Sequence, residues 1–239
     1  MSSTNLTGRR KFLTSTAGIG GGLTIASFAT AFGMTPAQAA AANDDPQTIA
    51  NLAATAETLA ITFYYSVITS ATFDIDDEAL DYFRLALDAE HYHLAVLGTL
   101  GGKSLTQQFY VPATVLSDAD VFVKTGLAAE TAFVGAYLAA TRVFGEAGLG
   151  KLAATTAQHA ASEAVHLSLI RDVAGLAPND LALNAAIYYN VSDALPTLAP
   201  FLKGGSGFIG PVMAPSQAQF ETALAGVRAT RPPPYAKLY

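Results

Sequence analysis

The chain has 239 residues, of which 51% are hydrophobic and 13% charged, and its formal net charge is −6. It is long and apolar enough for one domain with a sizeable core, and its negative charge argues against nucleic acid or an anionic membrane surface as a partner. The absence of cysteine excludes disulfides, thiolate metal sites, iron–sulfur clusters and cysteine nucleophiles.

Residues 1–39 have the pattern of an export signal. Arg9 and Arg10 precede an apolar, glycine-rich stretch at 13–32, and Ala37-Gln38-Ala39 offers a cleavage site of the A-x-A type. The arginine pair and the residues around it resemble a twin-arginine signal, although the first and last positions of that motif differ. The expected location is therefore periplasmic or in the cell envelope, with membrane contact only if the signal stays uncleaved as an anchor.

The first half of the mature chain predicts two helices. Asp45 and Pro46 suit a helix start, and apolar spacing continues to about residue 70, with Glu57 on the apolar stripe. A second helix is expected at 76–98, again with a glutamate, Glu90, in line with its apolar residues. The connection at 100–117 is too long for a simple hairpin turn, so we expect it to pack along the side of the helices.

The second half repeats this pattern and then loses it. A third helix is expected at 117–147 and a fourth at 149–174, with Glu130 and Glu163 on their apolar faces. Residues 176–239 are interpreted as an appendage of further helices and an extended tail. The pattern there predicts helices at 181–190, 194–202 and 215–228, a glycine-rich loop at 203–211 and an extended segment at 231–234.

One motif, Glu-x-x-His, occurs in both halves of the chain. Glu90 and His93 form the first copy, Glu163 and His166 form the second, and residues three apart on a helix share a face. A further glutamate, Glu57 or Glu130, lies 33 residues before each copy, and equivalent positions are 73 residues apart. Two helical hairpins would thus bring four carboxylates and two imidazoles together.

The interpretation of these four glutamates and two histidines depends on whether they are buried. Each residue alone has an ordinary explanation, such as a solvated glutamate or a histidine that fills a gap in the core. Four buried acids together are tolerated mainly through pairing or metal coordination. Carboxylate and imidazole ligands suit iron or manganese, and zinc is not excluded. In such a site Glu90 and Glu163 would bridge two metal ions, Glu57 and Glu130 would be terminal ligands, and His93 and His166 would bind one ion each.

Three further residues could support these ligands. Tyr64 and Tyr137 each stand seven residues after an upstream glutamate and could donate hydrogen bonds or relay radicals, although buried tyrosines are more often amphipathic core residues. His159 lies one turn before Glu163 and could orient a ligand or simply be half buried. His91 points away from Glu90 and is expected at the surface or beside the site.

At these residues the chain resembles the ferritin-like superfamily, and more narrowly the exported bacterial ferritin-like domain proteins, some of which are labelled desiccation-related. The resemblance covers about residues 46–175. It implies an all-α fold, a ferritin-like four-helix bundle at 40–175 with a long crossover between helices two and three, plus the C-terminal helical appendage. Members of the superfamily include iron-storing ferroxidases, peroxidases, manganese catalases and oxygenases.

Two functions are weighed from the sequence. The first is an exported di-metal protein that oxidises Fe(II) or reduces or dismutates peroxide in envelope stress protection, with metal ions and O₂ or peroxide as partners. The second is a non-catalytic structural or interaction protein of the envelope, in which a degenerate metal site acts as a staple. A ferritin cage is disfavoured because the shell would have to accommodate the signal and the appendage; a smaller homo-oligomer stays open.

Overall fold

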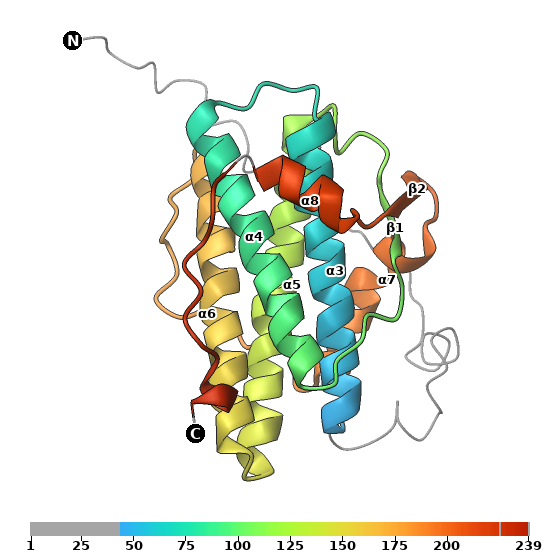
Figure 1. The fold of residues 1–239 in the computed structure, drawn as a ribbon. Helices are drawn as coiled ribbons and strands as arrows, with labels where there is room; N and C mark the ends of the chain where they lie inside the picture. The colour runs from blue at the N-terminus through green and yellow to red at the C-terminus, as the bar shows by residue number, and fades with distance from the viewer. Residues whose placement is uncertain (1–43, 225, 239) are drawn as a thin grey trace, which may run out of the picture.

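The computed structural model describes residues 44–224 and 226–238. The predicted signal at 1–39, with Arg9 and Arg10, lies outside these residues. The described chain is mostly helical, in agreement with an all-α class, and it also contains one small two-stranded sheet that the sequence did not predict (Figure 1).

Four long helices account for most of the described chain. All four were predicted, and their ends fall close to the predicted positions. They are α3 (Pro46–Ser70), α4 (Asp77–Thr99), α5 (Ala119–Glu146) and α6 (Gly150–Val173).

Aspartate side chains fix where three of these helices begin. Asp45 accepts hydrogen bonds from two backbone N–H groups of the first turn of α3, Asp76 from one in α4, and Asp118 from two in α5. Each such cap contributes about 1 kcal/mol and satisfies N–H groups that have no partner inside the helix.

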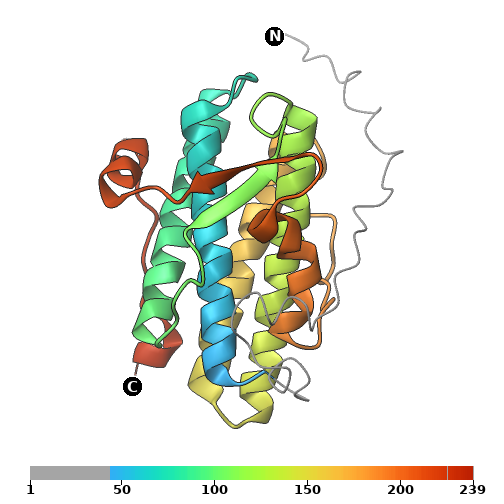
Figure 2. The same ribbon diagram turned by 90° about the vertical axis from the view of Figure 1, so that its right-hand side faces the viewer.

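The long helices lie side by side as two antiparallel hairpins, α3 with α4 and α5 with α6 (Figures 1 and 2). Short turns at 71–76 and 147–149 join the helices of each hairpin, where the sequence placed them. The connection between α4 and α5 runs along the side of the helices from one end to the other. By length and composition α5 could cross a membrane, but its packing against α6 is that of a core helix.

The long connection carries the unpredicted strand. Strand β1 (Gln108–Pro112) pairs antiparallel with β2 (Phe208–Met213), with Phe109 opposite Val212 and an irregularity before Val111. Phe109 and Val111 are buried, so this segment does pack on the helices as expected. Its partner strand is distant in sequence and lies in the predicted glycine-rich loop, and nothing local to either segment indicates the pairing.

The C-terminal region differs from its prediction at one helix. Residues 181–190 are not helical, so the helix predicted there is wrong. Leu183 is 87% exposed and Leu181 is also exposed, and only Ile187 and Tyr188 at the end of the segment pack against α5 and its neighbours, which is too little to stabilise a short helix. The segment instead runs against α5, where Arg142 donates hydrogen bonds to the carbonyl of Tyr189.

The remaining elements agree better with expectation. After the 3₁₀ turn η2 (Val191–Ala194) come α7 (Leu195–Lys203) and α8 (Gln217–Leu224), which correspond to the helices predicted at 194–202 and 215–228, although α8 is shorter. The end of the chain, with the 3₁₀ turn η3 (Tyr235–Lys237), lies along α4 and α6 (Figure 1).

A buried aspartate fastens this tail to α4. Asp88 is completely buried and accepts hydrogen bonds from the Ala229 N–H and the Arg231 guanidinium. Tyr92, one turn further along α4, donates to the carbonyl of Pro232. The C-terminal segment is therefore a fixed part of the described structure.

The core packing predicts how two leucines will respond to truncation. Leu87 is fully buried among aromatic side chains, so Leu87→Ala should lower the free energy of unfolding by about 2–5 kcal/mol. The matched change Leu183→Ala should alter it by no more than about 0.5 kcal/mol, because that side chain is exposed. Urea denaturation measures the change in the free energy of unfolding for each variant, as a shift of the midpoint at an unchanged m-value. Equal effects of the two changes would contradict the packing described.

Candidate metal centre

The six predicted ligands converge between the four long helices. Each hairpin supplies one glutamate from its first helix and a Glu-x-x-His pair from its second. All six side chains are buried, at 8% exposure or less: Glu57 on α3, Glu90 and His93 on α4, Glu130 on α5, and Glu163 and His166 on α6. Residues three apart point the same way on a helix, which is why each pair reaches one place.

The ligands form two overlapping groups. Glu57, Glu90, His93 and Glu163 make one group, whose ligand atoms lie within 4.8 Å of one another. Glu90, Glu163, Glu130 and His166 make the other by the same measure. Glu90 and Glu163 belong to both groups, and their bridging of two metal ions stays a prediction. These buried groups could hold metal ions.

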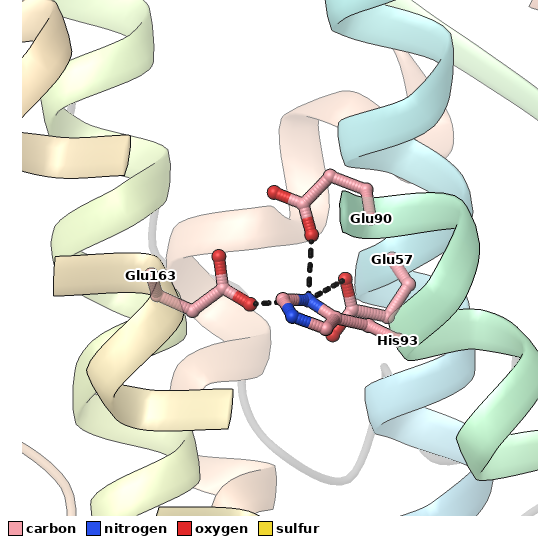
Figure 3. Close-up of side chains that lie close together, drawn as sticks. All are labelled: Glu57, Glu90, His93 and Glu163. Atoms are coloured by element: carbon pink, nitrogen blue, oxygen red, sulfur yellow. Dashed lines mark hydrogen bonds and ion pairs between the residues drawn. The ribbon is translucent and has the colours of Figure 1, made fainter. Parts of the chain in front are cut away.

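Each imidazole presents its Nδ1 atom to several carboxylates. His93 Nδ1 lies 3.0 Å from Glu90 Oε2, 3.1 Å from Glu163 Oε1 and 3.6 Å from Glu57 Oε2 (Figure 3). His166 Nδ1 lies 2.8 Å from Glu90 Oε1 and 3.1 Å from Glu163 Oε2. The two histidines thus have equivalent surroundings on opposite sides of the Glu90–Glu163 pair.

These distances fit the spacing of atoms that share one ion. Ligand atoms about 2.0–2.2 Å from a metal, at ordinary coordination angles, lie about 3.0–3.4 Å from one another. Hydrogen bonds alone satisfy the cluster poorly, because one Nδ1 carries at most one hydrogen yet faces two or three oxygens. Glu130 Oε2 is buried without a hydrogen-bond donor in the described chain, and Glu90 Oε1 and Glu163 Oε1 each face only a histidine Nδ1 that other carboxylate oxygens also face. Both features favour cations as the missing partners.

The tyrosines connect the two hairpins. The Tyr137 hydroxyl on α5 donates to Glu57 on α3, and the Tyr64 hydroxyl on α3 donates to Glu130 on α5. Sequence spacing had associated each tyrosine with the glutamate on its own helix, whereas in the structure each contacts the glutamate on the other. Burial and the neighbouring carboxylates raise the pKa of both hydroxyls well above the usual value, so both remain donors.

Burial and mutual repulsion govern protonation of the terminal glutamates. Loss of solvent raises the pKa of Glu57 well above its usual value, and the charges of Glu163 and Glu90 act in the same direction. Loss of solvent and the charge of Glu163 likewise raise the pKa of Glu130. Without a cation, these two carboxyl groups therefore tend to stay protonated.

The surroundings of His93, His166 and Glu90 instead favour the charged form of each side chain. Burial acts to lower the pKa of His93 and of His166, but the surrounding carboxylates overcome it and hold both pKa values well above the usual one. Burial acts to raise the pKa of Glu90, yet His166 and His93 hold it well below the usual value. Without metal, protonated imidazoles are thus the positive charges that Glu90 faces.

His159 lies against the cluster without joining it. Its ring centroid is 4.7 Å from that of His93 and 4.8 Å from that of Tyr137, and its Nδ1 is 2.8 Å from the carbonyl of Thr155. Burial, together with the charge of His93, lowers its pKa to about 4, so the ring is neutral at physiological pH. His91 instead stacks on Phe220 at the surface side of α4, away from the ligands.

Sequence reasoning did not find Asp88, which fastens the tail beside this site. It is a charged residue two positions before Glu90, and only its complete burial distinguishes it from the exposed acids of the same helix.

Comparisons with protein-family models, with curated proteins and with solved structures gave no match. Fold and site therefore define only a mostly helical protein with buried Glu/His groups that could hold metal ions. Its narrower relationship has to be argued from the site itself.

The pKa directions predict how the metal-free chain responds to pH. Between about pH 6 and pH 8 the folded state keeps protons, on His93 and His166 and on Glu57 and Glu130, that the unfolded state has released. A state that binds more protons loses stability as pH rises, so the free energy of unfolding should fall across this window. Urea denaturation of chelator-treated protein at several pH values measures the slope.

Two variants test where that slope originates. Glu57→Gln removes one of the retained protons, so its stability should fall less steeply with pH. Asp120→Asn changes an exposed carboxylate on α5 and should leave the slope as it is. Stability that rises between pH 6 and pH 8 in the metal-free chain would show that the cluster is not protonated as described.

Proposed function

We propose that this chain is a ferritin-like four-helix bundle protein that binds two metal ions, iron or manganese, and uses them to oxidise Fe(II) or to reduce or dismutate peroxide. One observation carries the proposal. Two buried ligand groups, each with three carboxylates and one imidazole, share Glu90 and Glu163 between them. Donors of this type suit iron and manganese best, and they also admit zinc.

Charge balance supports two ions rather than one. Glu57, Glu90, Glu130 and Glu163 together bring four negative charges when all are ionised, which two divalent cations offset. In this arrangement Glu57, Glu90, His93 and Glu163 would hold one ion, and Glu90, Glu130, Glu163 and His166 would hold the other, with Glu90 and Glu163 shared. The metals would supply the electron exchange with O₂ or peroxide.

The surrounding residues of the chain orient this set. Tyr64 and Tyr137 hold the terminal glutamates through hydrogen bonds that cross between hairpins. Each protonated tyrosine donates a hydrogen bond to one oxygen of its glutamate. The second oxygen of that carboxylate then remains available to a cation. An aromatic cluster that includes Phe63, Phe83 and Phe122 borders Tyr64 and shields that side of the site from water.

A small cavity offers a path to His93 for small polar species. It has a volume of about 190 Å³ and lies between α4, α6 and the C-terminal segment. Tyr92, Gln158, Ser162 and Arg231 contribute polar groups to its wall. Such a lining suits water, peroxide or a hydrated ion.

The second candidate is a structural role in which metal only fastens the helices together. Its supporting observation is the enclosure of the ligands, since Glu90 and Glu163 have no exposed surface and the tail is pinned across α4 and α6. In that case Glu57→Ala should reduce stability more than any turnover. In an oxidising centre it should reduce turnover more than stability.

The proposal includes export by the twin-arginine route to the periplasm or cell envelope. Its support is the sequence pattern at 1–39, together with a cofactor site that assembles only from four folded helices. A folded, metal-loaded protein is the kind of cargo that this route is expected to carry. Protection of the envelope against oxidative or drying stress follows from the resemblance stated above.

Metal analysis of the purified chain tests the proposed centre. The wild type should contain about two iron or manganese ions per chain, and Glu90→Gln/Glu163→Gln should lose both because the bridging carboxylates are gone. Its rate of Fe(II) oxidation or peroxide consumption should fall by at least about 10-fold. Elemental analysis and rate measurements on the same samples give both results.

The matched control for this experiment is Glu78→Gln/Glu146→Gln. It removes two exposed glutamates from α4 and α5 and should keep both metal and rate. A folded wild type that binds no metal would refute the proposal. Two ions per chain without turnover of Fe(II) or peroxide would favour the structural alternative.

Export is tested by changing the arginine pair. Arg9→Lys/Arg10→Lys should leave most of the chain in the cytoplasm as precursor, because the twin-arginine route requires both arginines. Lys11→Gln should still be exported. Cell fractionation with an immunoblot measures both variants, and undiminished export of the double variant would contradict the route proposed.

A further inference from the structure

A second and larger cavity opens at the end of the helices where α3 begins and α4 ends, the lower end in Figure 1. Its volume is about 420 Å³. All four long helices contribute to its wall. The side chains that line it are mainly apolar, and they include Ile49, Ala50, Ala53, Leu97, Phe144 and Leu152.

The inner end of this cavity reaches the candidate metal centre. Tyr137 and His159 both line it, and both are buried. Tyr137 donates its hydroxyl hydrogen to Glu57, and the His159 ring packs on His93, so each residue contacts a ligand directly. Asp45, Pro46 and Gln47 lie at the outer end and are exposed. A molecule in this cavity would thus extend from the surface to the neighbours of the metal ligands.

His159, which lines both this cavity and the 190 Å³ cavity, offers one unused hydrogen-bonding atom. Its Nδ1 faces the carbonyl of Thr155, so Nδ1 carries the hydrogen and donates it. Nε2 is then a lone-pair acceptor, and it is buried without any partner in the described chain. A buried acceptor without a donor is destabilising by about 1–3 kcal/mol, and such groups concentrate where a ligand completes them.

The size and lining of the cavity define the ligand. An apolar cavity of about 150 Å³ holds one benzene ring, so this one has room for a molecule of two fused rings or a medium-length chain. Among the described residues that line it, Asp45 is the only one with a charged side chain, and it lies at the exposed end. An ionised ligand would therefore lose its hydration inside without gaining an opposite charge.

We propose that this cavity binds an uncharged, mostly apolar organic molecule whose single hydroxyl group donates a hydrogen bond to His159 Nε2. Binding depends on the cavity alone, and only the role of this molecule as a substrate rests on the function proposed above. The 190 Å³ cavity near His93 also borders His159. The organic ligand and the small polar reactant would then reach the same histidine through two separate cavities.

Three probes separate shape from hydrogen bonding and charge. 2-Naphthol has two fused rings and one hydroxyl, naphthalene lacks the hydroxyl, and 2-naphthoate carries a negative charge. With the full chain, in both metal-loaded and chelator-treated form, 2-naphthol should bind about 10-fold more tightly than naphthalene, in keeping with one additional hydrogen bond. 2-Naphthoate should bind more weakly than either. Fluorescence titration and calorimetry measure the affinities.

Variants of the chain identify the cavity and the acceptor. Ala50→Phe fills the larger cavity and should weaken 2-naphthol by at least about 10-fold, whereas Ala89→Phe fills the smaller cavity near His93 and should change the affinity by less than about 2-fold. His159→Phe keeps a ring and removes the acceptor. It should weaken 2-naphthol about 10-fold and leave naphthalene nearly unchanged. Circular dichroism and thermal denaturation confirm that each variant is folded.

The outcomes separate this inference from the proposed function. Equal binding of 2-naphthol and naphthalene, or sensitivity to Ala89→Phe rather than Ala50→Phe, would overturn the assignment to this cavity and to His159. Two metal ions per chain with no probe binding would refute the inference alone. Probe binding in the expected order without any metal in the native protein would support the cavity and refute the metal centre.

Discussion

The burial of four glutamates between four helices is the constraint on which the rest of this structure depends. A carboxylate without water or a positive partner is unstable in a protein interior, and here the four share one small volume. The structure supplies several kinds of partner for these carboxylates. His93 and His166 face Glu90 and Glu163, and tyrosine hydroxyls donate hydrogen bonds to Glu57 and Glu130. Cations in the two ligand groups would complete the balance.

The pairing of the tyrosines makes the site a property of both hairpins together. Tyr64 and Glu57 stand on the same helix, yet Tyr64 bonds to Glu130 while Glu57 receives its hydrogen bond from Tyr137. Neither hairpin alone contains a complete ligand group, because Glu163 belongs to the group around His93 and Glu90 to the group around His166. Folding and assembly of the site are therefore one event.

His159 lies between the candidate metal centre and the two cavities that reach it. It contacts His93 and Tyr137, and it borders both the smaller cavity under the C-terminal segment and the larger cavity at the end of the helices. A neutral ring with an unused acceptor stabilises the fold little by itself. A ligand that donates a hydrogen bond to Nε2 would satisfy this acceptor.

The sequence by itself determined the long helices and the six residues of the buried Glu/His cluster. Apolar spacing and aspartate caps such as Asp45 act within a few residues, and the repeated Glu-x-x-His pattern with Glu57 and Glu130 upstream is visible without coordinates. Only the tertiary structure decided the pairing of β1 with β2, the exchange of tyrosines between hairpins, the missing helix at 181–190 and the apolar cavity. Each of these depends on what residues distant in sequence bring into contact, and local spacing carries no information about that.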